Sequence, residues 1–359
     1  MKGLPETYGT IGPSCASEDI LRQIFAEGIT GMRLNLSHAS LPESEPWIEA
    51  FHSAAAKEGV SPSLLIDMQG PELRVGKLAA PISLREGDEV TLVSDLESSG
   101  NGLLIPVPPA LIRDLKPETT LLMDDGKISL RTVCGQEQLD MPAMRAVVTV
   151  GGVLKSRKSI AAKGLSVQGD TLTAQDIMNL RCAPSMGVTE IMQPFVRGAD
   201  DLIRVRKAMR EQGAGDLRLF AKIENRAGAQ ALEEIIPQAD MIVIARGDLG
   251  NSLPLFRLPV LEDMIAAACR RAHKPFMVVT QMLASMEHSP VPTRAEVSDI
   301  YRAVAEGASA VMITGETAGG EYPVQAAAFL VRTAAEAYTY LQGKGPGSIE
   351  ELFEKGREL

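Results

Sequence analysis

Short apolar runs that end in polar residues or glycine recur along the chain and predict the strands of a sheet. They cover residues 8–12, 31–36, 63–67, 189–196, 217–223, 241–245, 276–280 and 310–314. Helical patterns between them cover residues 18–27, 200–210, 229–236, 258–272 and 294–306. Because strand and helix alternate, the sheet should be parallel, and units of this kind close into an α/β fold of the (β/α)8 TIM barrel type. A doubly wound open sheet is the alternative.

The alternation is interrupted between the third and the fourth apolar run. Strand-like runs at residues 89–93, 121–123 and 128–130 are separated by turn signals at residues 86–88 and 124–126. They predict a small all-β domain inserted after the third strand, where it can close over a site at the strand ends as a lid. The predicted boundaries are 1–75 for the first part of the barrel, 76–155 for the inserted lid domain, 156–342 for the second part of the barrel and 343–359 for a linker and a short helix.

Composition narrows the class of protein. The chain is 45% hydrophobic and only 4% aromatic, so its core should be aliphatic and closely packed. A net charge of −10 argues against nucleic acid or an anionic membrane surface as a partner. The N-terminal residues form no apolar signal segment, and no stretch reaches the roughly 18 apolar residues of a membrane span. A cytoplasmic location is therefore expected.

The cysteines are widely spaced and form no Cys-x-x-Cys pair. They stand at positions 15, 134, 182 and 269. This spacing argues against a disulfide framework or a zinc site. All of them are therefore expected to be reduced and structural.

Polar residues gather at the ends of the predicted strands, where a barrel of this type carries its chemistry. Arg33, Asn35 and Ser37 alternate along one strand and so share one face, as do Lys222 and Glu224 on another. Solvent-facing salt bridges are the alternative interpretation of each pair. Barrel strands are covered on both sides, however, so these charges are costly unless they bind each other, a metal or a substrate.

Two carboxylates predict a divalent metal site at neighbouring strand ends. Glu224 and Asp248 offer the hard oxygen ligands that Mg2+ or Mn2+ prefers. Lys222 would then stabilise a developing enolate or a transferring phosphoryl group. Backbone N–H groups near Gly247 could donate hydrogen bonds to a carboxylate. His38, taken alone, is typical of an ordinary hydrogen-bonded histidine.

Several motifs together resemble the pyruvate kinase family. They are Met-Arg-Leu-Asn-Leu-Ser-His at 32–38, Ile-Asp-Met-Gln-Gly-Pro-Glu-Leu-Arg at 66–74, Lys-Ile-Glu-Asn at 222–225, Ala-Arg-Gly-Asp-Leu-Gly at 245–250, Thr-Gln-Met at 280–282 and Gly-Glu-Thr at 315–317. They occur in the family's order, and the resemblance covers about residues 7–338. The family's usual C-terminal regulatory domain has no counterpart in this sequence, so no control by a sugar phosphate is expected.

The resemblance implies a role for each residue at the strand ends. Lys222 is expected to neutralise the phosphoryl group and the enolate, Arg33 to grip the phosphate, and Glu224 and Asp248 to hold Mg2+ or Mn2+. The remaining implied roles are K+ binding by Asn35, Ser37, Asp67 and the Met68 carbonyl, nucleotide binding by Arg74, His38, Arg157 and Asp125, substrate binding by Gly247, Asp248, Arg246 and Thr280, and proton delivery by Thr280 and Glu316.

The implied reaction is phosphoryl transfer between phosphoenolpyruvate and ADP, which gives pyruvate and ATP. A metal-dependent lyase or aldolase that uses a pyruvate enolate is one alternative, but it would need neither the insertion nor Asp125 and Arg157. A non-catalytic protein that binds phosphoenolpyruvate is the other. The barrel is expected to provide the contact of any homodimer.

Departures from the family pattern surround the predicted site. They are Met68, Gln69, Ala161, Pro194, Arg302 and Thr314, which bear on nucleotide preference and rate but not on the metal site. Glu72 bears on the monovalent cation, because family members that work without K+ have a lysine at the matching position. The resemblance therefore implies a requirement for K+.

Overall fold

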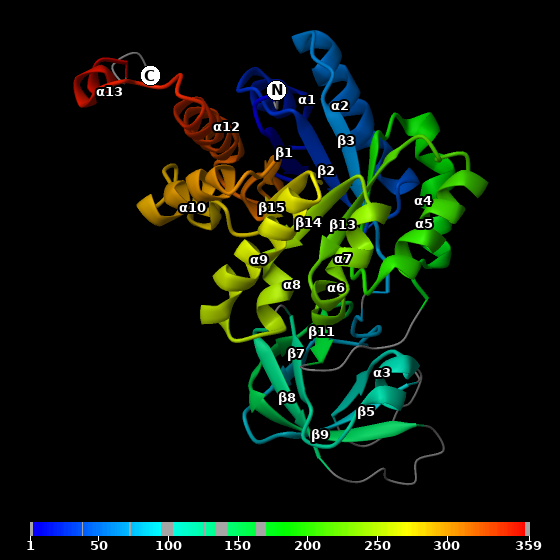
Figure 1. Cartoon of the computed structure of the whole chain (residues 1–359). Coiled ribbons are helices and arrows are strands. Elements are labelled where there is room, and N and C mark those ends of the chain that lie inside the picture. The colour runs from blue at the N-terminus through cyan, green and yellow to red at the C-terminus, as the bar shows by residue number, and fades with distance from the viewer. Residues whose placement is uncertain are drawn as a thin grey trace.

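The computed structural model describes residues 3–37, 39–71, 73–94, 103–124, 126–133, 142–162 and 170–355. Eight parallel strands form a closed barrel (Figure 1). In order around the barrel they are β1 (Glu6–Ile11), β2 (Gly31–Asn35), β3 (Ser63–Asp67), β12 (Glu190–Gln193), β13 (Arg218–Ile223), β14 (Met241–Ala245), β15 (Phe276–Val279) and β16 (Ala310–Met312). Closure confirms the predicted barrel and excludes the open sheet.

The largest difference between a predicted and an observed strand is at β12. The apolar run at 189–196 predicts a strand through residue 196, whereas β12 ends at Gln193. Pro194 has no backbone N–H to donate to a neighbouring strand, and Phe195 adopts a φ of +53°, which is incompatible with an extended chain. The chain therefore turns at the point where it enters the site.

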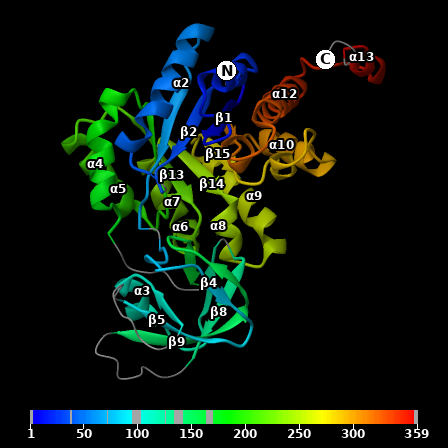
Figure 2. The ribbon, with the colours of Figure 1, turned by 180° about the vertical axis from the view of Figure 1, so that it is seen from behind.

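Helices cover the outside of the barrel (Figures 1 and 2). The longer ones are α1 (Glu18–Ala26), α2 (Glu45–Glu58), α4 (Ala174–Cys182), α5 (Ala199–Glu211), α9 (Leu258–Arg271), α10 (Arg294–Ala305) and α12 (Pro323–Leu341). Shorter ones are α6 (Arg226–Gln230), α7 (Leu232–Ile235), α8 (Arg246–Asn251) and α11 (Gly315–Ala318). The last helix, α13 (Ile349–Lys355), follows α12 and lies apart from the barrel (Figure 1). The pattern at 229–236 predicts one helix, but the chain forms two with a break at Ala231, and Pro237 then enters a 3-10 turn.

The segment between β3 and β12 forms sheets of its own. A two-stranded sheet pairs β4 (Ile82–Leu84) with β10 (Gly152–Leu154). A six-stranded sheet has the order β11 (Ile160–Ala162), β7 (Thr120–Met123), β8 (Ile128–Thr132), β9 (Ala143–Val150), β5 (Glu89–Val93) and β6 (Leu104–Pro106). The expectation of an all-β unit is wrong in one respect. Helix α3 (Pro109–Asp114) lies beside β5 and buries Leu111 and Ile112 in the core of this unit (Figure 2).

The chain leaves the barrel for the inserted unit and returns to it through two paired segments. Val75 N donates to Lys158 O at 2.8 Å, and Arg157 N donates to Val75 O at 2.9 Å. Ile160 N donates to Leu73 O at 2.8 Å. The two crossings therefore form one antiparallel connection. The domain boundaries at 75/76 and 155/156 remain predictions.

Aliphatic and methionine side chains make up most of the barrel interior, with two aromatic side chains, Tyr8 and Phe220, among them. Leu65, Met192, Val243 and Met277 pack inside it, and a larger apolar cluster lies between strands and helices. Within the described residues no helix is long and apolar enough to span a membrane. Cys15, Cys182 and Cys269 are free cysteines, whereas Cys134 lies outside the described residues.

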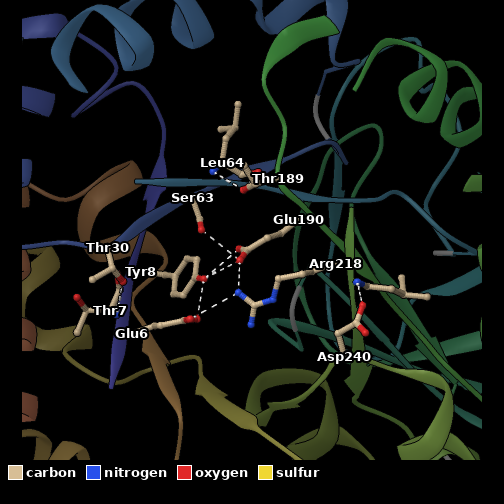
Figure 3. Close-up of polar contacts among 11 residues, drawn as sticks. Glu6, Thr7, Tyr8, Thr30, Ser63, Leu64, Thr189, Glu190, Arg218 and Asp240 are labelled. Carbon is tan, nitrogen blue, oxygen red and sulfur yellow. Dashed lines mark hydrogen bonds and ion pairs between the residues drawn. The ribbon is translucent and has the colours of Figure 1, made fainter. Parts of the chain in front are cut away.

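A buried polar network closes the barrel at the amino ends of its strands (Figure 3). The Glu190 carboxylate accepts hydrogen bonds from the Tyr8 hydroxyl at 3.0 Å and the Ser63 hydroxyl at 3.2 Å, and it pairs with Arg218 at 2.6 Å. Glu6 approaches the same guanidinium at 3.5 Å. Burial raises the pKa of Glu190, against the opposing effect of Arg218 and Tyr8. At this end of a barrel, such a network contributes to stability.

We expect Glu190→Ala to lower the free energy of unfolding by about 3 kcal/mol. The substitution removes the carboxylate that accepts hydrogen bonds from the Tyr8 and Ser63 hydroxyls and pairs with Arg218. The Tyr8 hydroxyl keeps Glu6 Oε2 as an acceptor at 3.0 Å, and Arg218, whose side chain is 39% exposed, keeps access to water and to Glu6. Urea unfolding of both proteins measures the difference. Glu6→Gln is the matched control on the exposed edge of the network and should cost less than about 1 kcal/mol. Equal losses in the two variants would contradict the central position of Glu190.

Candidate active site

Two connected cavities lie at the carboxyl ends of the barrel strands. The larger has a volume of about 950 Å³ and is lined by residues from the ends of β1, β2, β3, β13, β14, β15 and β16. The smaller, of about 430 Å³, is also lined by residues 156–159 of the chain returning from the inserted unit. Both are lined by Arg33, Asn35, Asp67, Lys222 and Asp248. The structure thus brings these predicted site residues together.

Four charged side chains form an alternating cluster, of which Arg33, Asp67 and Lys222 line both cavities and Glu224 lines the larger one. Asp67 Oδ2 lies 2.7 Å from Arg33 Nη2 and 3.3 Å from Lys222 Nζ. Lys222 Nζ lies 3.2 Å from Glu224 Oε2. The exposed fraction of each side chain is 14% or less, so these are not solvent-facing salt bridges. Positive and negative groups therefore alternate around one point of the cavity wall.

Burial and charge determine the ionisation of this cluster. Burial raises the pKa of Glu224. The ammonium group of Lys222 opposes this increase, whereas the neighbouring carboxylates of Asp248 and Asp67 add to it. Burial alone would lower the pKa of Lys222, but the carboxylates of Asp67 and Glu224 raise it above its ordinary value. Lys222 is therefore a permanent cation at neutral pH. A cation bound at Glu224 would stabilise the ionised carboxylate in place of a proton.

The carboxylates fit a divalent metal that keeps open positions. Glu224 Oε1 accepts a hydrogen bond from Phe195 N at 2.6 Å, whereas the buried Glu224 Oε2 accepts none in the described part of the chain. Residues 3–355, as far as they are described, contain no group of three His, Cys, Asp or Glu side chains able to hold a metal. Glu224 and Asp248 would thus need water and substrate oxygens as further ligands, as Mg2+ commonly does.

The oxygen donors predicted for a monovalent cation line the smaller cavity. They come from Asn35, Ser37, Asp67 and Met68. Asn35 Oδ1 accepts a hydrogen bond from Ser37 N at 3.1 Å, which fixes the loop after β2. The buried Asp67 Oδ1 accepts no hydrogen bond within the described ranges. An uncoordinated buried oxygen of this kind suits a cation ligand, because burial without a partner is costly.

Arg246 supports a strained residue at the end of β15. Its guanidinium donates to Thr280 O at 2.7 Å and pairs with Asp299 at 2.6 Å and Glu262 at 3.5 Å. Thr280 has a φ of +80°, which is unfavourable for a β-branched residue. A Cβ on Gly247 would lie 3.0 Å from the Thr280 methyl group, so glycine permits this close approach. Thr280 and Gly247 line the larger cavity, and substrate contact by Arg246 remains a prediction.

Glu316 lies beneath the cavity rather than in its wall. Its carboxylate accepts hydrogen bonds from Leu283 N at 3.0 Å and Thr314 N at 2.6 Å, and its side chain is buried. It thus joins the loops after β15 and β16, while Thr314 itself lines the cavity. The proton-delivery role implied for Glu316 remains a prediction.

The predicted nucleotide-binding residues are described only in part. Arg74 and Arg157 line the smaller cavity, and Arg74 Nη1 donates to Arg157 O at 2.6 Å. His38 and Asp125 lie outside the described residues. Of the departures from the family pattern, Met68, Gln69 and Pro194 line the same cavity. Arg302 instead pairs with Asp263 and Glu306 on the outer surface.

Sequence reasoning missed three residues at the site. Thr10 accepts a hydrogen bond from Arg33 Nη1 at 3.4 Å, Trp47 lines the larger cavity, and Lys158 in the smaller cavity pairs with Asp124 at 2.6 Å. Trp47 is the only tryptophan of the chain, and this rarity was the one feature of the sequence that could have drawn attention to Trp47. Its fluorescence can report binding in the cavity.

The closed barrel, the insertion after its third strand, and the buried lysine between carboxylates at the strand ends define the class as an α/β barrel protein with a charged site at the carboxyl ends of its strands. The family model for the pyruvate kinase barrel domain matches residues 6–327. The chain belongs to the pyruvate kinase family.

Pyruvate kinases from three organisms illustrate the similarity. The protein from Geobacillus stearothermophilus is 36% identical over 330 residues, which are 91% of this chain and 55% of the relative. The protein from Aeropyrum pernix is 34% identical over 347 residues, 96% of this chain and 73% of the relative. The protein from Clostridium acetobutylicum is 32% identical over 330 residues, which are 91% of this chain and 69% of the relative. The chain thus spans between about half and three quarters of the length of these relatives.

Proposed function

We propose that this chain transfers a phosphoryl group from phosphoenolpyruvate to ADP, giving pyruvate and ATP. The observation that carries the proposal is the buried Lys222, held between Asp67 and Glu224 in the wall shared by both cavities. A fixed cation at this point stabilises negative charge that develops during transfer. The named activity of the relatives supports the same reaction.

Each site residue has its own role in the proposed reaction. Arg33 binds the transferring phosphate, and Lys222 stabilises the enolate of pyruvate as the bond to phosphorus breaks. Glu224 and Asp248 would hold Mg2+ or Mn2+, which supplies further positive charge to the phosphate and enolate oxygens when bound. Thr280, which lines the larger cavity, would take part in delivering a proton to the enolate carbon. Arg74 and Arg157 would bind ADP in the smaller cavity.

The direct test is ATP formation from phosphoenolpyruvate and ADP with Mg2+ and K+ present. Equal amounts of pyruvate and ATP are expected. Binding of phosphoenolpyruvate without product would support the non-catalytic alternative. Carbon–carbon bond cleavage of a 2-keto acid without any nucleotide would support the lyase alternative. Trp47 fluorescence follows binding independently of turnover.

We expect the activity to require K+. Asn35, Ser37, Asp67 and Met68 offer oxygen donors in one cavity, and Glu72, which lies outside the described residues, carries a negative charge where a lysine would substitute for the ion. Replacing K+ with a bulky tetraalkylammonium ion at constant ionic strength should remove most of the activity. The Glu72→Lys variant should be much less sensitive to the exchange. Full wild-type activity without K+ or NH4+ would contradict this requirement.

Three further proposals concern the inserted unit, the oligomeric state and the cellular location. The inserted unit would act as a lid, which its position beside the smaller cavity supports. A homodimer would form through the barrel, where Phe256, Val260 and Met264 expose apolar side chains at four-residue spacing. The cytoplasmic location expected from the sequence belongs to the same proposal.

A further inference from the structure

We propose that Asp176, which belongs to neither cavity wall, is a positioning residue that fixes the loop after β3 and, through it, Asp67 and the predicted K+ ligands. The inference rests on the proposed function for its kinetic consequences. Its structural part, the attachment of the loop to Asp176, stands independently of the reaction.

Asp176 is fully buried near the start of helix α4. Its Oδ1 accepts a hydrogen bond from Gln69 N at 2.9 Å, and its Oδ2 accepts one from Gly70 N at 3.1 Å. Oδ2 also accepts hydrogen bonds from Thr173 N and the Thr173 hydroxyl, both at 2.8 Å. One carboxylate therefore joins the helix start to a loop more than a hundred residues earlier in the sequence.

These contacts exceed what a helix cap requires. A capping box needs only the reciprocal bonds between Thr173 and the residue three positions later. A buried carboxylate is costly unless its charge is compensated, and in the described part of the chain no lysine or arginine pairs with Asp176. Backbone N–H groups provide the compensation, and hydrogen bonds to an ionised group are stronger than neutral ones. The backbone amides of Gln69 and Gly70 therefore stabilise the buried Asp176 carboxylate.

The loop that Asp176 holds is also confined from its other side. Met68 N donates to Met192 O at 3.0 Å, and Gly70 has a φ of +57°. A Cβ on Gly70 would lie 2.6 Å from Pro194 Cγ. The loop therefore lies between Asp176 and Pro194, with little room to shift.

The first residues of this loop belong to the proposed active site. Asp67 Oδ2 contacts both Arg33 and Lys222, and Met68 supplies the backbone carbonyl predicted for K+. Loss of the Asp176 contacts would free Gln69 and Gly70, and the displacement would pass directly to Met68 and Asp67. Misplacement of about 1 Å at a reacting centre can reduce a rate by about a hundredfold.

Asp176→Asn is the first test. It retains one oxygen acceptor but replaces the other with an N–H2 group that cannot accept from the loop and from Thr173. We expect the half-saturating K+ concentration to rise and kcat to fall, each by about tenfold or more. We also expect faster amide hydrogen exchange at Gln69 and Gly70, which can be measured without any turnover.

Two further variants separate positioning from stability. Thr173→Val removes the hydroxyl of the helix cap and its 3.4 Å contact with the Gln69 side chain, but it leaves both Asp176 bonds to the loop backbone. It should therefore lower the melting temperature without changing K+ dependence. Gly70→Ala displaces the loop from the Pro194 side while Asp176 is intact, so it should reproduce the K+ shift even if Asp176→Asn fails to fold.

The outcomes are distinct. A K+ shift in Asp176→Asn and Gly70→Ala, but not in Thr173→Val, supports positioning. Wild-type K+ dependence and kcat in folded Asp176→Asn, or unchanged exchange at Gln69 and Gly70, overturns it. If the wild type forms no ATP, the proposed function fails, and the exchange measurement alone decides whether Asp176 holds the loop.

Discussion

Replacing Lys222 with methionine is expected to lower kcat by about a thousandfold or more while leaving the fold and divalent-metal binding largely intact. The ammonium group lies between Asp67 and Glu224 in the wall of both cavities, where under the proposed function it would stabilise the developing enolate. Methionine fills similar space without the charge. Neither Glu224 nor Asp248 is altered, so both proposed metal ligands remain.

The measurement is single-turnover and steady-state kinetics combined with Mn2+ binding by electron paramagnetic resonance. Lys207→Met is a matched control, because Lys207 makes only an exposed ion pair with Glu211 on α5. It should leave kcat unchanged. A Lys222→Met variant that keeps more than about a tenth of the wild-type rate would remove Lys222 from the proposed role.

Replacing Glu224 with glutamine should raise the half-saturating Mg2+ concentration by about a hundredfold or more. Glutamine has the same size, and its oxygen can still accept the hydrogen bond from Phe195 N. The variant loses the negative charge shared by Oε1 and Oε2, of which Oε2 makes no hydrogen bond in the described chain and lies 3.2 Å from the Lys222 ammonium. Oε2 is the atom that we propose as the metal ligand. The loss should therefore appear as weaker metal binding rather than as unfolding.

Titration with Mn2+ measures this affinity directly. Glu316→Gln is the matched control, because Glu316 is an equally buried carboxylate that contacts the backbone of two loops instead of lining a cavity. Its metal affinity should equal that of the wild type. If Glu224→Gln retained wild-type affinity for Mn2+ and Mg2+, another group would have to hold the cation.

The barrel could be predicted from sequence because its strands are buried on both faces. Residues 241–245, for example, form an unbroken apolar run that ends at Arg246, and the observed strand β14 has the same bounds. The site could be located for a related reason. Parallel strands bring their carboxyl ends to one edge, so polar residues after separate strands, such as Asn35 and Lys222, must lie near one another.

Other features depend on contacts between distant parts of the chain and carry no local signal. Asp176 resembles an ordinary helix cap in the sequence, and only the fold places Gln69 and Gly70 against it. Glu316 follows a strand end, as the site residues do, but its buried carboxylate accepts hydrogen bonds from Leu283 N and Thr314 N and does not line the cavity. The strands β4 and β10 have three residues each, too few for a periodicity to appear.

The paired crossings at the base of the inserted unit also affect how the barrel can fold. Leu64 and Thr189, which join β3 to the start of β12, are 125 residues apart in sequence. Arg74 and Arg157, which meet at the crossings, are 83 residues apart. Once the inserted unit has folded, the loop that barrel closure must order shrinks to about 40 residues, which lowers its entropic cost by about 1 kcal/mol. This favours a folding order in which the inserted unit forms first and brings the two portions of the barrel together.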